Sequence, residues 1–434
     1  MSAFLGMRGT GDWVTNERPE SWRQGILYLY PNGSMPLTAI TSMMGSEAIT
    51  DPHHHWWCKT MSGQAGSITA GEIYTDAAMT SAVGDASVKG AVVYCKVTEA
   101  VASEFRKDFV VLLRDTDDIE VDVVAEVLSV TKNGNNSCIA VRLLEADDNS
   151  ATHGLSSVDR ILIISTAQPE GAPMPEAVTY NPSEIDNYSQ IWEVSLDLTR
   201  TAIRTKLRTE DAYKEAKREA LWMIGVLMEK AFFWSIPTEN TDANTGKKKR
   251  TTGGLRWFIR TYAPDNIDNY ALNTDYTGYT WKQAGEDWLG DQLVKAFKYG
   301  AEEKLAICGA GTLLGLEKLA KQGATINIES GVDIGYGIKV TRWKTSQGTL
   351  LLKTHPLFSH EPTTTNCMFI LEPSDLKYRY IDDVTFKPDP DFMKGGRASH
   401  DARKESYIAE ALLEYHFPEK CMFLSGFNQD NELT

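Results

Sequence analysis

Residues 209–236 read TEDAYKEAKREALWMIGVLMEKAFFWSI and carry the strongest helical pattern in the chain. Apolar residues recur there every three or four positions, which places them on one face of a helix. Thr209 suits the N-cap of this helix, and Pro237 cannot continue it. We expect the core-facing residues to be Tyr213, Ala220, Ile224, Leu227 and Phe232.

The two halves of this helix differ in polarity. Residues 213–219 are rich in Lys, Arg and Glu, so only one stripe of that half can be buried. Residues 221–234 are apolar on nearly every side, so we expect the chain's own fold to enclose them and Leu227→Asp to prevent folding. Such a helix suggests a spine that crosses between two bodies of structure. A core helix of an ordinary two-domain protein fits the same pattern.

The composition is that of a globular protein with two or three cores. The 434 residues are 42% hydrophobic, yet no apolar run approaches the ~18 residues of a membrane span. The first residues lack the charged and apolar regions of a signal peptide. We therefore expect synthesis in a cytoplasm and no membrane partner. Six scattered cysteines without a CxxC pair predict reduced, mostly buried thiols.

The net charge of -15 argues against a typical nucleic-acid-binding protein, which would carry a basic patch or domain. It permits a protein that encloses nucleic acid without gripping it, because an acidic wall repels phosphate. The one basic run, Lys247 to Arg250, lies among polar residues and predicts a solvated loop. Contact between this run and a nucleic acid or an acidic neighbour is the alternative.

The first fifty residues predict an arm rather than a domain. Two short helices are expected at 20–30 and 37–44, and neither has a partner nearby in sequence. Such an arm packs on a later domain or on another molecule, where Trp and Met suit an interface. The candidates for subunit contacts, in the arm and in later strands, are Trp13, Trp22, Tyr28, Tyr30, Met43, Met44, Trp56, Trp57 and Trp192.

Three consecutive histidines, His53 to His55, precede Cys58 and invite a zinc interpretation. Adjacent residues on a strand point to opposite faces, so consecutive histidines chelate poorly. No second ligand pair follows at a suitable spacing. We therefore expect a loop that enters a strand, with Trp56 or Trp57 packed, and no metal ion.

Residues 84–168 change to short β-branched runs and predict an all-β domain, either a small barrel or a sandwich. Asn133-Gly134 predicts a hairpin turn within it. Residues 51–83, ahead of this domain, are expected to hold a separate strand region. Residues 169–208 follow as a linker and an extended strand that leads into the long helix.

The part after the long helix, residues 237–434, predicts a mixed α+β fold with antiparallel hairpins. A helix is expected at 286–299, and a strand at 304–309 is followed by a second helix that ends before Gly323. Further turns are expected at Ser346 to Gly348 and at Phe417-Pro418.

The chain contains no motif of catalytic chemistry. Gly309, Gly311 and Gly315 imitate a dinucleotide fingerprint, but Leu314 stands where GxGxxG requires its third glycine. GxSxG, GxxxxGKS/T and HExxH are absent. Aspartates gather at turns, which Asp favours, although residues 117–120 leave calcium as an alternative. We expect no catalytic residue and no cofactor.

The order of these segments resembles the major capsid proteins of tailed bacteriophages, which have the Hong Kong 97-type fold. SWRQGILYLYPNGSMPLTAITSMM, before a strand with two tryptophans, resembles the N-terminal arm leading into the extended loop of a lineage with an inserted β-domain. NYSQIWEVSLDLTRT resembles the return strand of that loop, and the helix ending in LMEKAFFWSIP resembles the spine helix. YGIKVTRWKTSQGTLLLKTHPLF resembles paired strands of the peripheral domain, and ESYIAEALLEYHFPEKCMFLSGF resembles the last hairpin.

The resemblance covers nearly the whole chain and implies a structural, non-enzymatic protein. Such a protein self-assembles into pentamers and hexamers of an icosahedral shell around double-stranded DNA, without sequence-specific binding. The implied partners are portal, scaffold and decoration proteins, and the implied location is the virion capsid, assembled in the bacterial host cytoplasm. The implied parts are an arm (1–50), an inserted β-domain (84–168) within an extended loop, a spine helix (209–236), and peripheral and axial domains (237–434, the axial one roughly within 250–340).

Two features depart from the type phage of this family. Its cross-link needs a lysine on the loop, an asparagine on a neighbour and a catalytic glutamate. Lys59 and Glu229 are present, but no matching asparagine aligns, so we do not expect that chemistry. The long charged segment that serves as a fused scaffold is also absent, so a separate scaffold protein is expected.

Two alternatives stay open on the sequence. A nanocompartment shell of the encapsulin type, holding an enzyme cargo, shares the fold, although the β-domain and the arm favour a phage. A β-rich carbohydrate-active or redox enzyme would need clustered acids or a cofactor motif, and the sequence offers neither.

Overall fold

The computed structural model describes residues 46–59, 64–68, 71–84, 87–147, 154–205, 211–322, 327–333, 339–389 and 402–433. The chain divides into two compact units, residues 59–183 and residues 1–58 with 184–434. Within these described ranges, no helix is long and apolar enough to cross a membrane. Residues 1–45 of the arm fall outside them, and so do its expected helices and Trp13, Trp22, Tyr28, Tyr30, Met43 and Met44.

The smaller unit contains one antiparallel sheet of seven strands, in the order β3-β9-β6-β7-β8-β5-β4. Alternate residues such as Val111 and Leu113 face a buried apolar core, because successive side chains of a strand point to opposite faces. The predicted hairpin turn is confirmed, since Gly134 has a φ of 55° between β7 and β8. The elements are β3 (Ala65–Ser67), β4 (Ile73–Tyr74), β5 (Val92–Val97), α2 (Glu99–Ala102), β6 (Phe109–Arg114), β7 (Asp122–Thr131), β8 (Ser137–Leu143) and β9 (Arg160–Thr166).

The predicted boundary of this unit at residue 84 is wrong, because the unit begins at Lys59. Strands β3 and β4 pair with β9 and β5, so the residues expected to form a separate strand region belong to the same sheet. Strands of two or three residues are too short to show an alternating pattern. The single sheet also excludes the sandwich alternative for the described strands.

In the larger unit, β2 (His53–Cys58) and β10 (Ser183–Tyr188) form a two-stranded sheet. The β unit is therefore inserted, in sequence, between the two strands of one extended pair. This order agrees with an extended loop whose return strand continues toward the long helix.

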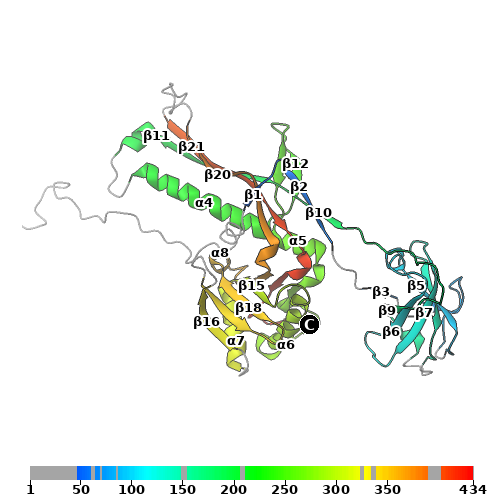
Figure 1. The fold of residues 1–434 in the computed structure, drawn as a ribbon. Coiled ribbons are helices and arrows are strands. Elements are labelled where there is room, and N and C mark those ends of the chain that lie inside the picture. Colours follow the sequence, from blue (N-terminus) through cyan, green and yellow to red (C-terminus); the bar gives the residue numbers. More distant parts are fainter. Residues whose placement is uncertain are drawn as a thin grey trace, which may run out of the picture. The chain divides into compact units, whose positions relative to one another are not determined.

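The long helix α4 (Ala212–Trp234) packs along a four-stranded sheet in the order β1-β20-β21-β11, and Figure 1 shows it beside these long strands. Asp211 caps the helix, because its carboxylate accepts a hydrogen bond from the backbone N–H of Tyr213 at 2.9 Å. Thr209, the expected cap, lies outside the described residues. The strands are β1 (Ser46–Ala48), β11 (Gln190–Thr199), β20 (Leu376–Lys387) and β21 (Ala402–Tyr415), and α3 (Arg200–Arg204) follows β11.

A mixed seven-stranded sheet forms the rest of the larger unit, in the order β14-β22-β19-β15-β18-β17-β16. Leu305 and Ile307 of β15 face a core that includes Phe232 of α4, whereas Ala306 faces a second core that includes Trp288 of α6. The strands are β14 (Ile267–Asn269), β15 (Glu303–Cys308), β16 (Asn327–Asp333), β17 (Lys339–Lys344), β18 (Thr349–Thr354), β19 (Met368–Leu371) and β22 (Met422–Ser425). The remaining elements are β12 (Thr238–Thr241), β13 (Lys248–Thr251), α5 (Leu255–Tyr262), α6 (Trp281–Ala296), α7 (Ala310–Gln322) and α8 (Pro356–His360).

The predicted α+β fold is confirmed, and so are the turn between β17 and β18 and the turn at Phe417-Pro418. Two details differ. Helix α6 begins at Trp281, ahead of the expected 286, because Thr280 and Gln283 form a capping box there. The basic run expected in a loop forms β13, which pairs with β12.

The seven-stranded sheet extends beyond the range of 250–340 that we expected for one inserted domain. Its strands come from residues 267–371 and again from 422–425. The β17–β18 hairpin, expected in the peripheral domain, lies in this sheet and not in the four-stranded sheet that packs on α4. The sequence did not show this because β19 and β22 belong to this sheet, whereas β20 and β21, which lie between them in the chain, belong to the four-stranded sheet.

Candidate functional site

The inner face of α4 anchors the larger unit. Ala220, Ile224 and Phe232 are buried, as expected for core-facing residues, and Ile224 and Phe232 belong to the core that the two sheets share. Tyr213, at the polar end, is half-buried, and its hydroxyl donates to a carboxylate oxygen of the buried Glu405 at 2.6 Å. Burial, followed by this hydrogen bond, raises the pKa of Tyr213 to about 12. The inner face therefore includes polar as well as apolar packing.

The prediction that Leu227 lies in the core is wrong, because 43% of it is exposed. Met228 is buried instead, and it follows Ile224 and precedes Phe232 at steps of four residues. Position 227 is turned by about 100° around the helix axis from Met228. Both positions are apolar, so the sequence could not tell which of them faces inward.

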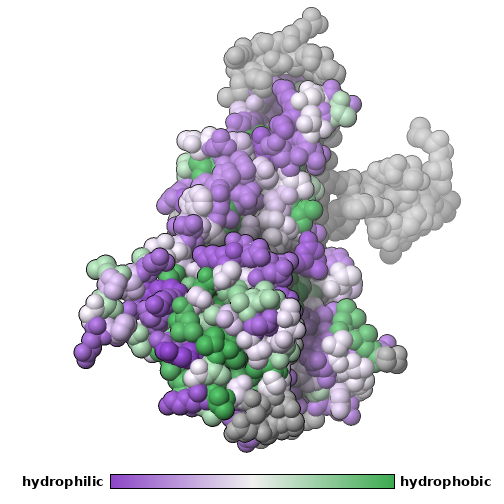
Figure 2. Space-filling model, turned by 90° about the vertical axis from the view of Figure 1, so that its right-hand side faces the viewer, coloured by the Kyte–Doolittle hydropathy of each residue, from purple (hydrophilic) through white to green (hydrophobic). Residues whose placement is uncertain are grey.

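The apolar half of α4 is also not enclosed by the described part of its own chain. Trp222 is 39% exposed and Met223 is 49% exposed. We call Met223 and Leu227 the outer patch of α4. Other large apolar side chains reach the surface as well, and Figure 2 shows a face on which hydrophilic residues predominate while hydrophobic residues gather in patches. Large apolar surfaces of this kind mark contacts with other molecules.

The prediction that Trp56 and Trp192 form subunit contacts is wrong. Trp56 and Trp192 are only 6% and 5% exposed, because both lie on the core-facing sides of their strands. Trp56 donates its indole N–H to the carbonyl of Tyr415 at 3.1 Å, and Trp192 packs edge-on against Phe232. Trp57 points to the opposite side of β2 and is 62% exposed, so it stays a candidate for a subunit contact.

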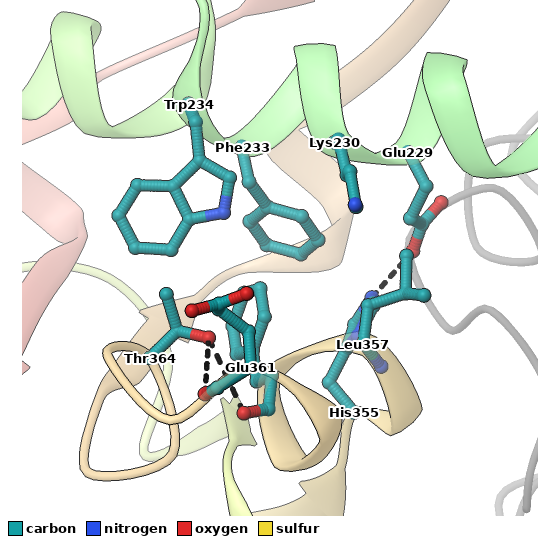
Figure 3. A pocket seen from close by; sticks show the side chains of 9 residues that line it. Glu229, Lys230, Phe233, Trp234, His355, Leu357, Glu361 and Thr364 are labelled. Atoms are coloured by element: carbon teal, nitrogen blue, oxygen red, sulfur yellow. Dashed lines mark hydrogen bonds and ion pairs between the residues drawn. The ribbon is translucent and has the colours of Figure 1, made fainter. Parts of the chain in front are cut away.

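A pocket of about 210 Å³ lies between the C-terminal part of α4 and helix α8 (Figure 3). Its most polar feature is a fully buried pair, in which Nε2 of His355 lies 2.9 Å from a carboxylate oxygen of Glu229. Lys230, Phe233 and Trp234 line it from α4, as Figure 3 shows. The sequence singled out Glu229 but gave no sign of His355, which comes from 126 positions further along the chain.

The hydrogen bonds of His355 assign this pair a structural role. Its Nδ1 accepts a hydrogen bond from the backbone N–H of Leu357 at 3.1 Å, which caps the start of α8. Nδ1 therefore carries no proton, and Nε2–H donates to Glu229. Because both nitrogens are engaged, the imidazole is not free to act as a general base. The pair joins α4 to α8.

A second charged cluster surrounds Glu414, which is buried on β21. The carboxylate is hydrogen-bonded to His54 of β2, to Arg379 of β20 and to His416. Burial alone would raise the pKa of Glu414, but the hydrogen bonds from His416, Arg379 and His54 outweigh it and lower the pKa to about 2. This carboxylate therefore holds the extended strand β2 to the four-stranded sheet.

Apart from the histidine run of β2, the chemical candidates from the sequence show no site. Within the described ranges, no group of three or more His, Cys, Asp or Glu residues is arranged to hold a metal ion. The calcium alternative at 117–120 is a local turn, in which the backbone N–H groups of Asp117 and Glu120 donate to Asp115 and Asp118. All six cysteines are buried, and none of them forms a disulfide bond, as predicted.

The comparisons with known proteins agree on one family. The model of the family described as SU10 major capsid protein matches residues 8–428. The protein described as the major capsid protein of Pseudomonas phage PaMx41 is 24% identical over 451 aligned residues, which cover 100% of this chain and 98% of that protein.

The solved structures that match the chain include two from phages and one from an encapsulin complex. A structure from Mycobacterium phage Bobi has a TM-score of 0.45 at 9% identity and covers 96% of this chain and 98% of that one. A structure from Microbacterium phage Oxtober96 has a TM-score of 0.43 at 10% identity, with 94% and 96% covered. An encapsulin complex from Synechococcus elongatus has a TM-score of 0.37 at 11% identity, with 58% and 77% covered.

Proposed function

Because this chain belongs to the SU10 major capsid protein family, we propose that its copies assemble into pentamers and hexamers of an icosahedral shell. The shell would enclose the double-stranded DNA genome of a tailed phage and would have the Hong Kong 97-type organisation. The chain's own order of elements supports this, with an extended strand pair, a long helix and two sheets that share one core. The family favours a phage shell over a compartment for an enzyme cargo.

The outer patch of α4 is the observation that carries the proposal. Met223 and Leu227 are 49% and 43% exposed on a helix whose other side is anchored in the core. A helix with two apolar faces is stable in water only where something covers the second face. In a closed shell, a neighbouring copy supplies that cover through a repeated contact between different surfaces. Exposed Trp57 on β2 provides a further apolar contact.

The charge of the chain suits a wall around DNA rather than a DNA-binding surface. The net charge is -15, and the one basic run is partly neutralised within its own hairpin. Glu239 of β12 lies 2.7 Å from Lys248 and 2.8 Å from Arg250 of β13. Such a wall would repel phosphate and let the packed polymer slide.

We assign the chain a structural rather than a catalytic role. The buried pair of Glu229 and His355 is engaged in holding α8 to α4. Assembly would take place in the bacterial host cytoplasm, with a portal, a separate scaffold and possible decoration proteins as partners. The arm, residues 1–50, would reach across neighbouring subunits, where its large apolar side chains suit an interface.

Sedimentation and negative-stain microscopy of the purified protein test the proposal. We expect pentamers, hexamers or closed shells, and shells isolated from infected cells should contain double-stranded DNA and no enzyme cargo. A stable 48.3 kDa monomer that never assembles, even together with the other head proteins of its phage, would overturn it.

Deletion of residues 1–45 tests the role of the arm separately. The remaining chain should keep the circular dichroism spectrum of the full protein, because both units have cores of their own. It should fail to form normal shells. Shells of normal size and yield from the truncated protein would refute a role of the arm in assembly.

A further inference from the structure

The histidine run of β2 contains a pair that shares one face of the strand. Consecutive histidines do point to opposite faces, and His54 turns toward the buried Glu414. His53 and His55, however, are two positions apart, so they lie on the same face. The sequence argument against chelation holds for adjacent histidines and does not apply to this pair.

The two imidazoles are placed as a bidentate ligand for a metal ion. Nδ1 of His53 lies 3.2 Å from Nε2 of His55, and the ring planes are inclined by 52°. Two nitrogens bound to one tetrahedral ion, each at ~2.0–2.1 Å, lie about 3.3 Å apart. The separation observed between the two nitrogens is thus close to the one that a single ion requires.

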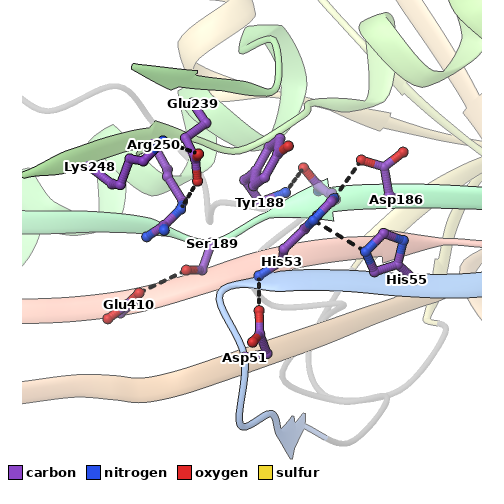
Figure 4. A network of polar contacts seen from close by, with 11 residues as sticks. Asp51, His53, His55, Asp186, Tyr188, Ser189, Glu239, Lys248, Arg250 and Glu410 are labelled. Atoms are coloured by element: carbon purple, nitrogen blue, oxygen red, sulfur yellow. Dashed lines mark hydrogen bonds and ion pairs between the residues drawn. The ribbon is translucent and has the colours of Figure 1, made fainter. Parts of the chain in front are cut away.

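The remaining nitrogen of each ring faces a carboxylate of the adjacent strand β10 (Figure 4). Nε2 of His53 lies 2.9 Å from Asp186, and Nδ1 of His55 lies 2.7 Å from Glu184. Carboxylates at these positions orient metal-binding histidines and keep the proton on the outer nitrogen. Nδ1 of His53 and Nε2 of His55 are hydrogen-bonded to each other, so one of them carries a proton that a bound ion would displace.

The pair is held by contacts with neighbouring residues and is open to solvent. The ring of His53 stacks on Tyr188 with the centroids 4.3 Å apart, and the backbone N–H of His53 donates to Asp51 at 2.8 Å. The side chains of His53 and His55 are 35% and 42% exposed, so an ion can enter and water can fill its remaining positions. The two nearby carboxylates balance the charge of a divalent ion.

We propose that His53 and His55 form a binding site for one divalent cation of the imidazole-preferring class, such as Zn²⁺, Ni²⁺ or Cu²⁺. Nδ1 of His53 and Nε2 of His55 are the ligands, while Asp186 and Glu184 act as positioning residues. Because the ligands come from β2 and the positioning carboxylates from β10, a bound ion braces the strand pair at the place where the chain leaves for the β unit.

Cu²⁺ titration of the full-length, EDTA-dialysed and unassembled protein tests the site. Electron paramagnetic resonance of the wild-type protein should show one bound Cu²⁺ per chain with two nitrogen ligands, and Zn²⁺ should displace it. His53→Gln and His55→Gln should each abolish this signal. Asp186→Asn should weaken binding tenfold to a hundredfold, as loss of an orienting carboxylate does in other sites.

The matched control is His360→Gln, which removes an exposed histidine at the end of α8 and should leave binding unchanged. Circular dichroism of each variant separates loss of the site from loss of the fold. The electron paramagnetic resonance spectrum of the wild-type protein tests the site even if a variant fails to fold. A wild-type protein without a two-nitrogen Cu²⁺ signal would overturn the proposal, and so would binding that survives His53→Gln. The measurement is made on subunits, so its outcome does not depend on shell formation.

Discussion

Leu227→Asp separates the two faces of the spine helix α4 most sharply. Leu227 lies on the outer patch and Ile224, one turn earlier, lies in the core with 1% exposure. We expect Leu227→Asp protein to fold and to fail in assembly, whereas Ile224→Asp protein should not fold. This replaces the expectation from the sequence, in which Leu227→Asp would prevent folding.

The exposed fraction of Leu227 sets the size of the effect. Complete burial of a leucine side chain contributes ~1.5–3 kcal/mol, and 43% of Leu227 is exposed in the subunit. Covering this part in the shell is therefore worth about 1 kcal/mol per contact, so Leu227→Ala should weaken each contact roughly fivefold. An aspartate at this position would bury an unpaired charge on assembly, at a cost of several kcal/mol per contact.

Thermal unfolding followed by circular dichroism, together with sedimentation, measures both effects. Leu227→Asp protein should melt within a few degrees of the wild type and sediment as unassembled subunits. Lys214→Ala, an exposed change on the polar half of the same helix, should affect neither property. Leu227→Asp protein that is unfolded would show that the helix is enclosed by its own chain, and normal shells from it would show that nothing covers the outer patch.

Three further outcomes follow from the buried polar groups. The pKa of the Glu414 carboxyl is about 2 in the folded chain and 4.5 in the unfolded chain. Its contribution of about 3 kcal/mol to the free energy of unfolding is therefore complete above pH 4.5 and is lost as the pH falls toward 2. In urea unfolding of subunits, Glu414→Gln should flatten this acid dependence, and an unchanged pH dependence in the variant would contradict the prediction. His355→Ala leaves the buried Glu229 without the imidazole and should cost ~3–5 kcal/mol in the same assay, whereas a loss below about 1 kcal/mol would show that the pair is not important for stability. Burial raises the pKa of Cys95, Cys308 and Cys421 to about 12, so a thiol reagent at pH 8 should modify them only after unfolding, and rapid labelling of the native protein would refute their burial.

The existence and position of the long helix could be predicted from periodicity alone. Its buried face could be predicted only in part. Ala220, Ile224 and Phe232 follow the helical repeat, but Leu227 and Met228 are both apolar neighbours and compete for the next inward position. Local pattern cannot separate a residue that faces the chain's own core from one that faces another molecule, because both kinds of burial select the same side chains.

Strand residues show the same limit. The sequence grouped Trp56, Trp57 and Trp192 as contact candidates, whereas strand alternation places Trp56 and Trp192 in the core and Trp57 outside. The register that decides this is set by pairing with distant strands, such as that of β11 with β21. The pair of Glu229 and His355 depends in the same way on contacts between residues far apart in sequence.

The layout of the β unit was predicted correctly where its strands are long. The runs that form β6, β7, β8 and β9 have enough β-branched residues to be recognised, and Gly134 identifies one turn. Strands β3 and β4 are two or three residues long, and the sheet, not the local sequence, determines them. Gly66 of β3 shows how contacts with distant residues constrain these strands, since a Cβ there would lie 2.2 Å from the side chain of Val101 in α2.

Oxidative footprinting of Met223 tests most directly whether neighbouring copies cover the outer patch of α4 in the shell. Hydroxyl radicals followed by mass spectrometry report the solvent access of individual methionines in subunits and in assembled shells. Met228, five residues further on and 5% exposed, serves as the internal control and should react slowly in both forms. We predict that Met223, 49% exposed in the subunit, is oxidised readily in subunits and is protected in shells. Equal oxidation of Met223 in the two forms would contradict the account.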